Sequence, residues 1–213
     1  MKDMKSLSQQ KNNLSIGSGE FYATIAFTTA ERIVAPRKNG NANKLDINDK
    51  QFHNWYRFVL SFPPHLVRDY LIRFGLKHGD TVLDPFCGTG TTVVEAKLNG
   101  VSSIGIEANT MAHFASSVKV DWSVDPDRLL NHAISVASRA HKIIATETSP
   151  LRKLPEEAFS LLLRDSISPL PLHKSLVLLE QIKNNSEQQL LNHELLALAK
   201  ALVFSISNLH FGP

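Results

Sequence analysis

The most constraining feature of this 213-residue chain is a glycine turn set between two short apolar runs. Residues 81–83 form an apolar run bounded by aspartates, which is typical of a buried strand in a parallel sheet. Residues 87–90, Cys-Gly-Thr-Gly, follow as a tight turn, and residues 91–98 have the pattern of a helix. Residues 103–106 form a second run, which Glu107 follows directly. The order strand, glycine turn, helix, strand and acid predicts one βαβ unit of a doubly wound sheet.

The chain around this unit divides into three predicted regions. Residues 1–52 are a polar N-terminal extension, expected to be partly flexible, with a β-leaning stretch at 21–34. Residues 53–125 form the α/β core, which also contains an aromatic-rich segment and two predicted helices. Residues 126–213 are predicted to be helical. The helices expected outside the central unit cover 65–74, 110–118 (capped by Asn109), 127–144, 156–163, 172–182 and 187–206, and the one further strand considered is 142–145.

Composition narrows the function classes that the chain can belong to. Cys87 is the only cysteine, which excludes a disulfide framework and a zinc finger, and no metal site is predicted. No run of about 18 uncharged apolar residues occurs, and the first thirty residues are too polar for a signal peptide. We therefore expect a soluble cytoplasmic protein without membrane contact.

Charge is distributed unevenly along the sequence. Residues 1–79 hold 12 Lys and Arg against 6 Asp and Glu, whereas residues 80–213 hold 11 against 14. A basic front half permits nucleic acid as a partner. Ordinary solvated lysines and arginines explain the same distribution, so charge alone does not establish that partner.

The glycine turn does not match the phosphate-binding loops that it superficially resembles. A nucleotide triphosphate loop needs a lysine where Thr91 stands. A dinucleotide fingerprint needs a third glycine where Val93 stands. Asp84, at the end of the first strand, would repel a pyrophosphate and attract a cation.

A ligand with an ammonium group at one end and a ribose at the other fits these residues better. Asp84 could hold the ammonium, while Gly88 and Gly90 allow the backbone to approach the ligand closely. Glu107, at the end of the next strand, could accept hydrogen bonds from both ribose hydroxyls. S-adenosylmethionine has both features. The alternative is that the glycines serve only a tight turn and that the two acids are solvated strand ends.

Two segments carry a resemblance to a known family. Residues 84–92, Asp-Pro-Phe-Cys-Gly-Thr-Gly-Thr-Thr, resemble the cofactor motif of DNA methyltransferases that modify exocyclic amino groups, adenine N6 or cytosine N4. In that family the motif typically reads Asp-Pro-Phe-Xaa-Gly-Ser/Thr-Gly-Thr. Residues 61–65, Ser-Phe-Pro-Pro-His, and the helix after them resemble the element that flanks the methionine end of the cofactor. The resemblance covers roughly residues 53–121.

This resemblance implies an α/β fold, namely a partial class I (Rossmann-like) methyltransferase core with a helical C-terminal region. It implies S-adenosyl-L-methionine as the methyl donor and double-stranded DNA as the substrate, in a restriction–modification or orphan system. Phe62 and Pro63 would close over the methionine end of the cofactor. The full set of expected cofactor-binding residues is Asp84, Pro85, Phe86, Gly88, Gly90, Thr91, Glu107, Phe62 and Pro63.

The catalytic loop of that family is missing from the sequence. The family uses Ser/Asn/Asp-Pro-Pro-Tyr/Phe to hold the amino group of a flipped base, whereas the only Pro-Pro here, Pro63-Pro64, has Phe62 before it and His65 after it. No catalytic residue is therefore identified. Either the chain is the front of a longer enzyme, with 126–213 an insertion or part of target recognition, or a second polypeptide supplies the loop.

In both cases we expect this chain alone to bind the cofactor weakly and to transfer no methyl group. Two rival functions stay open. One is a non-catalytic DNA-binding or assembly subunit with a structural Rossmann-like core, and the other is a methyltransferase that acts on RNA.

Other side chains have more ordinary interpretations. Cys87 is expected to pack under the turn rather than to act as a nucleophile. Trp55 and Tyr56 either stack on a base or pack in the core. The leucines at 190, 191, 195, 198 and 202 follow helical spacing and are expected to form a packing stripe.

Overall fold

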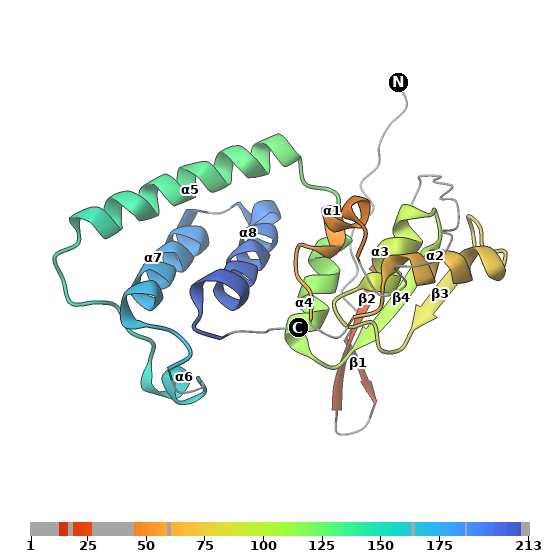
Figure 1. The fold of residues 1–213 in the computed structure, drawn as a ribbon, viewed down its shortest axis with the longest axis horizontal. Coiled ribbons are helices and arrows are strands. Elements are labelled where there is room, and N and C mark those ends of the chain that lie inside the picture. The colour runs from red at the N-terminus through yellow and green to blue at the C-terminus, as the bar shows by residue number, and fades with distance from the viewer. Residues whose placement is uncertain are drawn as a thin grey trace. The chain divides into compact units, whose positions relative to one another are not determined.

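A computed structural model shows that the chain forms two compact units, Met1–Asp121 and Trp122–Pro213 (Figure 1). The structure describes residues 13–16, 19–26, 45–58, 61–162, 165–185 and 187–209. The first unit contains the glycine turn and a mixed sheet, and the second unit is helical where it is described. The two units are considered separately below.

The first unit combines a four-stranded sheet with short and medium helices. In chain order its elements are β1 (Asn13–Ile16), β2 (Gly19–Ala26), a 3-10 turn (Ile47–Asp49), α1 (Lys50–His53), α2 (Pro64–Arg73), β3 (Thr81–Asp84), α3 (Thr91–Leu98), β4 (Ser102–Glu107) and α4 (Thr110–Lys119). The predicted strand–helix–strand unit is therefore present as β3, α3 and β4.

The sheet places the ends of two neighbouring strands at one edge. Its strand order is β1-β2-β4-β3, in which β3 and β4 run parallel and β2 runs antiparallel to both β1 and β4. Asp84 lies opposite Gly105, so β4 continues to Glu107 beyond the last paired residue of β3. The residues that follow both strands consequently meet at the same edge of the sheet.

The N-terminal region contributes strands to this sheet. The β-leaning stretch predicted at 21–34 corresponds to β2 in its first part, and residues 27–34 lie outside the described residues. Much of the N-terminal extension, expected to be partly flexible, also lies outside the described residues. Residues 13–16 of it form β1.

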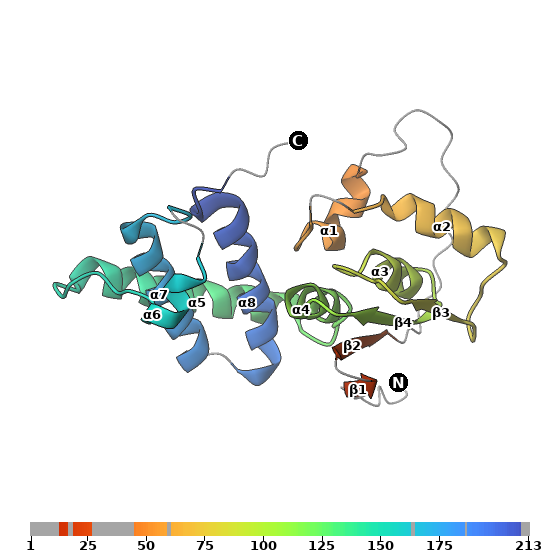
Figure 2. The ribbon, with the colours of Figure 1, turned by 90° about the horizontal axis from the view of Figure 1, so that it is seen from below.

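Helix α3 fills the space between the sheet and α2 (Figure 2). Val93, Val94 and Ala96 are fully buried on it, and Val120, just after α4, packs against the two valines. The helix begins directly after Gly90 and ends at Asn99-Gly100, where Gly100 has a positive φ of 78°. These bounds agree with the predicted helix.

Strand β3 differs from the prediction in its burial. The apolar run at 81–83 predicted a buried strand, yet the side chain of Leu83 is 59% exposed. The prediction of burial was wrong because β3 pairs only with β4 among the residues described, and the run is therefore not enclosed.

The second unit is built from helices around a small apolar core. Its elements are α5 (Pro126–Thr146), α6 (Glu156–Ser160), α7 (Pro169–Asn185), α8 (Gln188–Ala201) and a terminal π-type turn (Leu202–Ile206). The strand considered at 142–145 is wrong, because these residues continue α5, and α6 ends at Ser160 instead of reaching residue 163.

Facing helices form the core of this second unit. Val136 of α5, Ile182 of α7 and Leu198 of α8 pack together, with leucines 191, 195 and 202 against them. The predicted leucine stripe therefore packs inside its own unit. Within the described ranges, no helix is both long and apolar enough to cross a membrane.

Candidate functional site

The glycine turn has backbone geometry that glycine adopts readily. Gly88 has a φ of 53° and Gly90 a φ of 92°. A Cβ atom at Gly90 would lie 2.8 Å from Cβ of Ser116 in α4, whereas a Cβ at Gly88 would meet no atom within 4 Å. Gly90 is thus required by the close packing of α4, and Gly88 borders open space.

Glu107 fixes the turn from the end of the neighbouring strand. One carboxylate oxygen accepts a hydrogen bond from the backbone N–H of Gly88 at 2.8 Å, and the other accepts one from the N–H of Asn109 at 2.8 Å. Each oxygen of a carboxylate can accept a second hydrogen bond. Glu107 is half-buried, so it can hold the turn and still accept donors from a ligand.

Asp84 and its neighbours form the outer part of the turn. The Oδ1 atom of Asp84 accepts a hydrogen bond from the N–H of Phe86 at 3.0 Å, while the side chain itself is half-buried. Pro85 is exposed and the ring of Phe86 is 86% exposed. The turn therefore presents an aromatic ring and a carboxylate to solvent beside Gly88.

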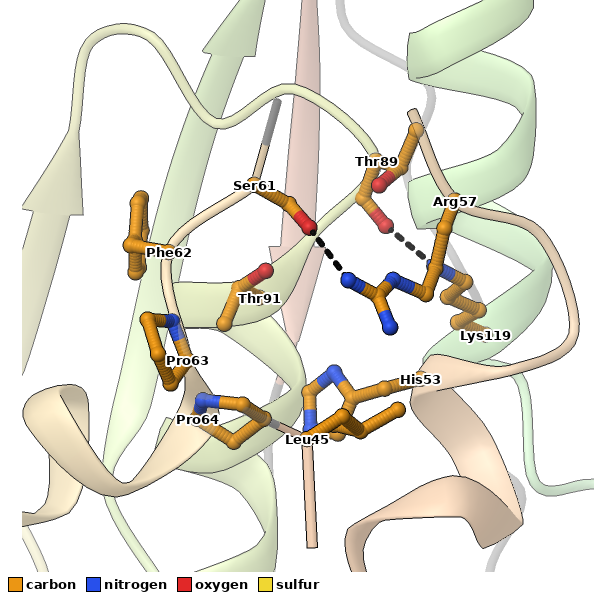
Figure 3. A pocket seen from close by; sticks show the side chains of 10 residues that line it. All are labelled: Leu45, His53, Arg57, Ser61, Phe62, Pro63, Pro64, Thr89, Thr91 and Lys119. Carbon is orange, nitrogen blue, oxygen red and sulfur yellow. Dashed lines mark hydrogen bonds between the residues drawn. The ribbon is translucent and has the colours of Figure 1, made fainter. Parts of the chain in front are cut away.

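A small pocket lies between the loop before α2 and the turn (Figure 3). It is lined by Leu45, His53, Arg57, Ser61, Phe62, Pro63, Pro64, Thr89, Thr91 and Lys119. The structure thus brings three of the expected site residues, Phe62, Pro63 and Thr91, around one cavity. The other six do not line this pocket. Of these, Gly88 and Glu107 are hydrogen-bonded to each other.

Lys119 and Arg57 are site residues that sequence reasoning missed. Lys119, 1% exposed at the end of α4, donates from Nζ to the carbonyl oxygen of Thr89 at 2.8 Å and to that of Tyr56. Arg57 donates to Oγ of Ser61 at 3.3 Å. Lys119 therefore ties the turn to the loop before α2. Its sequence signal was weak, since a lysine in the last turn of a helix is ordinary.

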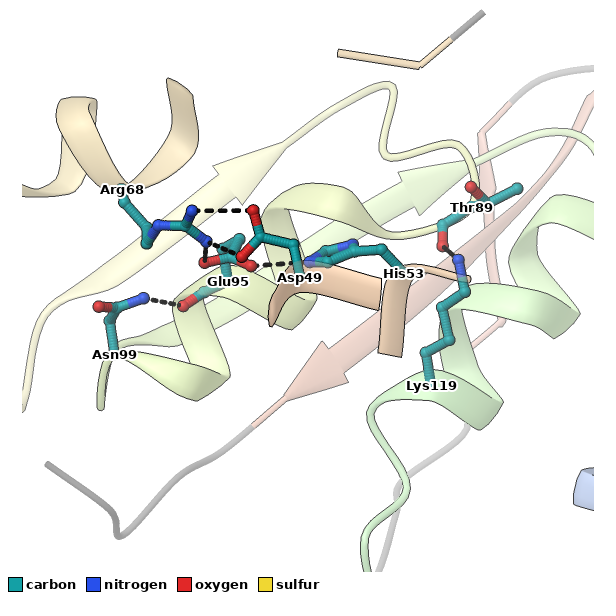
Figure 4. Close-up of polar contacts among 7 residues, drawn as sticks. All are labelled: Asp49, His53, Arg68, Thr89, Glu95, Asn99 and Lys119. Atoms are coloured by element: carbon teal, nitrogen blue, oxygen red, sulfur yellow. Dashed lines mark hydrogen bonds and ion pairs between the residues drawn. The ribbon is translucent and has the colours of Figure 1, made fainter. Parts of the chain in front are cut away.

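A buried charged network adjoins the pocket through His53 (Figure 4). Glu95 of α3 is 1% exposed, and its carboxylate contacts Nε2 of His53 at 2.7 Å and accepts from Nη1 of Arg68 at 2.9 Å. Arg68 also donates to both carboxylate oxygens of Asp49 at 3.0 Å. Burial lowers the pKa of Arg68, but the two carboxylates outweigh it and hold that pKa above its ordinary value. The network joins α1, α2 and α3.

Cys87 lies beneath the turn, as predicted. Its side chain is 4% exposed, and a Cβ atom on Gly105 of β4 would come within 2.7 Å of Sγ. Burial raises the pKa of the thiol to about 12, so Cys87 is protonated at neutral pH. This environment suits a packing residue and not a nucleophile.

Tyr56 belongs to the core of the first unit. It is 5% exposed, its ring meets the ring of Phe58 edge-on at 6.0 Å, and burial raises its pKa. Of the two interpretations considered for this aromatic segment, core packing is confirmed for Tyr56.

Comparison with known proteins finds sequence similarity to methyltransferases. Residues 15–116 match the family model of DNA methylases of the N6/N4 type. The chain is 31% identical over 158 residues to the Type II methyltransferase M.BsoBI of Geobacillus stearothermophilus, covering 74% of this chain and 29% of that protein. It is 48% identical over 65 residues to the Type II methyltransferase M.MjaI of Methanocaldococcus jannaschii, covering 29% of this chain and 20% of that protein.

A third relative acts on RNA. The tRNA (guanine(10)-N2)-dimethyltransferase of Methanothermobacter thermautotrophicus is 35% identical over 78 residues, which is 36% of this chain and 23% of that protein. The chain spans less than a third of the length of each of these three relatives. No solved structure gives a significant match. Through residues 15–116, the chain is thus similar to the DNA methylases of the N6/N4 type.

Proposed function

We propose that the first unit binds S-adenosyl-L-methionine and that the chain is the cofactor-binding part of a DNA methyltransferase with a class I, Rossmann-like core. The acceptor would be an exocyclic amino group, adenine N6 or cytosine N4, in double-stranded DNA. The observation that carries this proposal is the carboxylate of Glu107, held against the amide of Gly88 at the ends of two parallel strands.

The residues around the turn suit the two polar ends of this cofactor. Glu107 would accept the ribose hydroxyls through the lone pairs that Gly88 and Asn109 leave free. Asp84, with one oxygen engaged by Phe86, would offer the other oxygen to the ammonium. The open space at Gly88 lets the backbone approach the ligand. When bound, the cofactor supplies a methyl group made electrophilic by its sulfonium, and these residues bind and orient it.

The methyl acceptor needs a second group of residues. A base flipped from the duplex must be held with its amino nitrogen in line with the methyl group, and the Pro-Pro-Tyr-type loop that would do this is not in the sequence. We infer that another segment, of the same or of a second polypeptide, supplies it. The outer side of β3, which pairs with no strand in the described part of the chain, is where the sheet can continue.

Isothermal titration calorimetry with S-adenosylhomocysteine tests the proposed cofactor site. Wild type should bind, and Glu107→Ala should bind at least about 10-fold more weakly, because a charge-assisted hydrogen bond contributes about 1.5–3 kcal/mol. Glu157→Ala, which removes an exposed carboxylate of the second unit, is the matched control and should bind like wild type. Equal affinity of wild type and Glu107→Ala would remove Glu107 from the site.

An RNA substrate is the second candidate. It is favoured by the match to the tRNA methyltransferase, whose name specifies guanine N2, also an exocyclic amino nitrogen. Competition of duplex DNA and tRNA for the chain in a gel-shift assay separates the two candidates. Preference for tRNA at equal nucleotide concentration would favour the RNA substrate.

A further inference from the structure

The pocket in front of Arg57 is basic (Figure 3). Its ten lining residues include two basic side chains, Arg57 and Lys119, and no aspartate or glutamate. His53, also in the lining, already contacts the carboxylate of Glu95. An anionic group entering this space would therefore meet basic side chains and no carboxylate from the wall.

Arg57 has more N–H donors than the hydrogen bonds found for it use. Lys119 directs Nζ to the carbonyl oxygens of Tyr56 and Thr89. Arg57 has five N–H donors, and the hydrogen bond found for it in the described part of the chain goes to the hydroxyl of Ser61. A guanidinium with free donors matches the two oxygens of a carboxylate.

The wall of the pocket opposite Arg57 also favours an anion. Thr91 is 8% exposed, and its hydroxyl points toward the space before the guanidinium (Figure 3). Thr91 is the first residue of α3, and the preceding Gly90 provides no side-chain cap for the first amides of the helix. Because Thr91 lines the pocket, the positive end of the helix dipole lies at this wall.

The size of the pocket limits the anion. Its interior volume is about 10 Å³, with Phe62, Pro63 and Pro64 as the apolar side. A cavity of this order holds a group about the size of one water molecule. One oxygen of a carboxylate fits at the inner end of the pocket, and a di- or triphosphate does not.

We propose that Arg57 binds the α-carboxylate of the methionine part of the cofactor in this pocket. The assignment rests on the proposed function. Residues 88–91 run from the amide held by Glu107 to the pocket wall, so one short turn would separate the nucleoside end of the ligand from its carboxylate end. Asp84, outside the pocket, would remain the partner of the ammonium.

A comparison of two ligands on two variants tests this assignment. The ligands are S-adenosylhomocysteine and its decarboxylated analogue S-adenosyl-3-thiopropylamine, which keeps the ammonium and the nucleoside. Arg57→Met should weaken binding of S-adenosylhomocysteine about 10- to 100-fold and leave the analogue unchanged, because only the first ligand has a carboxylate to lose. Arg73→Met, a change of an exposed arginine at the end of α2, should alter neither affinity. Arg57→Lys should restore part of the loss.

Each other result overturns the assignment. Equal weakening of both ligands by Arg57→Met would show a structural role, and no weakening of either would show that Arg57 is outside the site. Loss of duplex-DNA binding with unchanged affinity for S-adenosylhomocysteine would make this pocket a site for a nucleic-acid phosphate. Failure of wild type to bind either ligand would instead refute the proposed function itself, and the assignment with it.

Discussion

Gly88 and Gly90 stand in one turn but meet different requirements. Both have positive φ, yet only Gly90 faces a neighbour that leaves no room for a side chain, the Cβ of Ser116 at 2.8 Å. Gly88 borders open space that the proposed ligand would approach. The two glycines are therefore separable by experiment: Gly90 is needed for packing, and Gly88 would serve the proposed ligand.

Alanine substitution should separate these requirements in urea unfolding. Gly90→Ala should lower the free energy of unfolding by about 3 kcal/mol, because overpacking adds to the unfavourable φ. Gly88→Ala should lower it by about 1 kcal/mol, the cost of the left-handed conformation alone. Trp55 fluorescence in a Trp122→Phe background reports on the first unit. Equal losses for the two variants would contradict the packing of α4 against the turn.

Cys87 makes stability depend on pH in a defined direction. Its pKa rises from about 9 in the unfolded chain to about 12 in the fold, chiefly because of burial. Between these values the unfolded state releases a proton that the folded state keeps. Stability should therefore fall as pH rises above 9, by up to about 1.4 kcal/mol per pH unit from this group.

Urea unfolding of wild type and Cys87→Ala between pH 8 and pH 10.5 isolates that contribution. The difference between the two proteins should shrink steadily above pH 9, because only wild type carries the thiol. A constant difference across this range would show that Cys87 is not held protonated by burial.

Helix α2 shows how an element can be predicted correctly while its buried face is not. Leu66, Tyr70 and Phe74 stand four residues apart and predicted the helix, but Tyr70 and Phe74 are more than half exposed. The buried face carries Arg68 instead, because Arg68 pairs with Glu95 of α3. Hydrophobic spacing predicts a helix and does not say which partner covers it.

The central α/β unit was predictable because its signals are local. Thr81–Asp84, Thr91–Leu98 and Ser102–Glu107 are each bounded by an acid or a glycine within a few residues. The network and the pocket were not predictable, since Glu95 meets His53 across 42 residues and Lys119 meets Thr89 across 30. Such pairings depend on how helices pack, and a single sequence carries little information about that.

The charged network of Glu95, His53, Arg68 and Asp49 should stabilise the packing of α1, α2 and α3. Glu95→Ala leaves the buried Arg68 and His53 without their shared carboxylate, so the free energy of unfolding should fall by about 3–5 kcal/mol. Asp49→Ala should cost less, since Arg68 keeps Glu95. The same Trp55 fluorescence measurement checks both variants. A larger loss for Asp49→Ala would contradict the central position of Glu95.

At the scale of the whole molecule, the proposed ligand residues all lie in the first unit, and the second unit has a core of its own. Under the proposed function the chain binds the methyl donor, while its sequence contains no loop of the family type to hold the acceptor base. Binding and transfer should therefore be separable in the purified chain.

Incubation with tritiated S-adenosylmethionine and either plasmid DNA or tRNA tests that separation. We expect no methyl group to be transferred to either nucleic acid, because the sequence contains no Pro-Pro-Tyr-type loop to accept the amino hydrogens. Methylation of either nucleic acid above the level of a Glu107→Ala control would show that the chain contains an acceptor site.

The central claim is that the turn between β3 and α3 holds a nucleoside ligand, and backbone-amide NMR of the full chain during titration with S-adenosylhomocysteine tests it most directly. The account predicts saturable shifts at Gly88, Thr89, Gly90 and Asn109, with the amides of residues 127–144 in the second unit unchanged. Shifts confined to residues 122–213, or none at millimolar ligand, would contradict it.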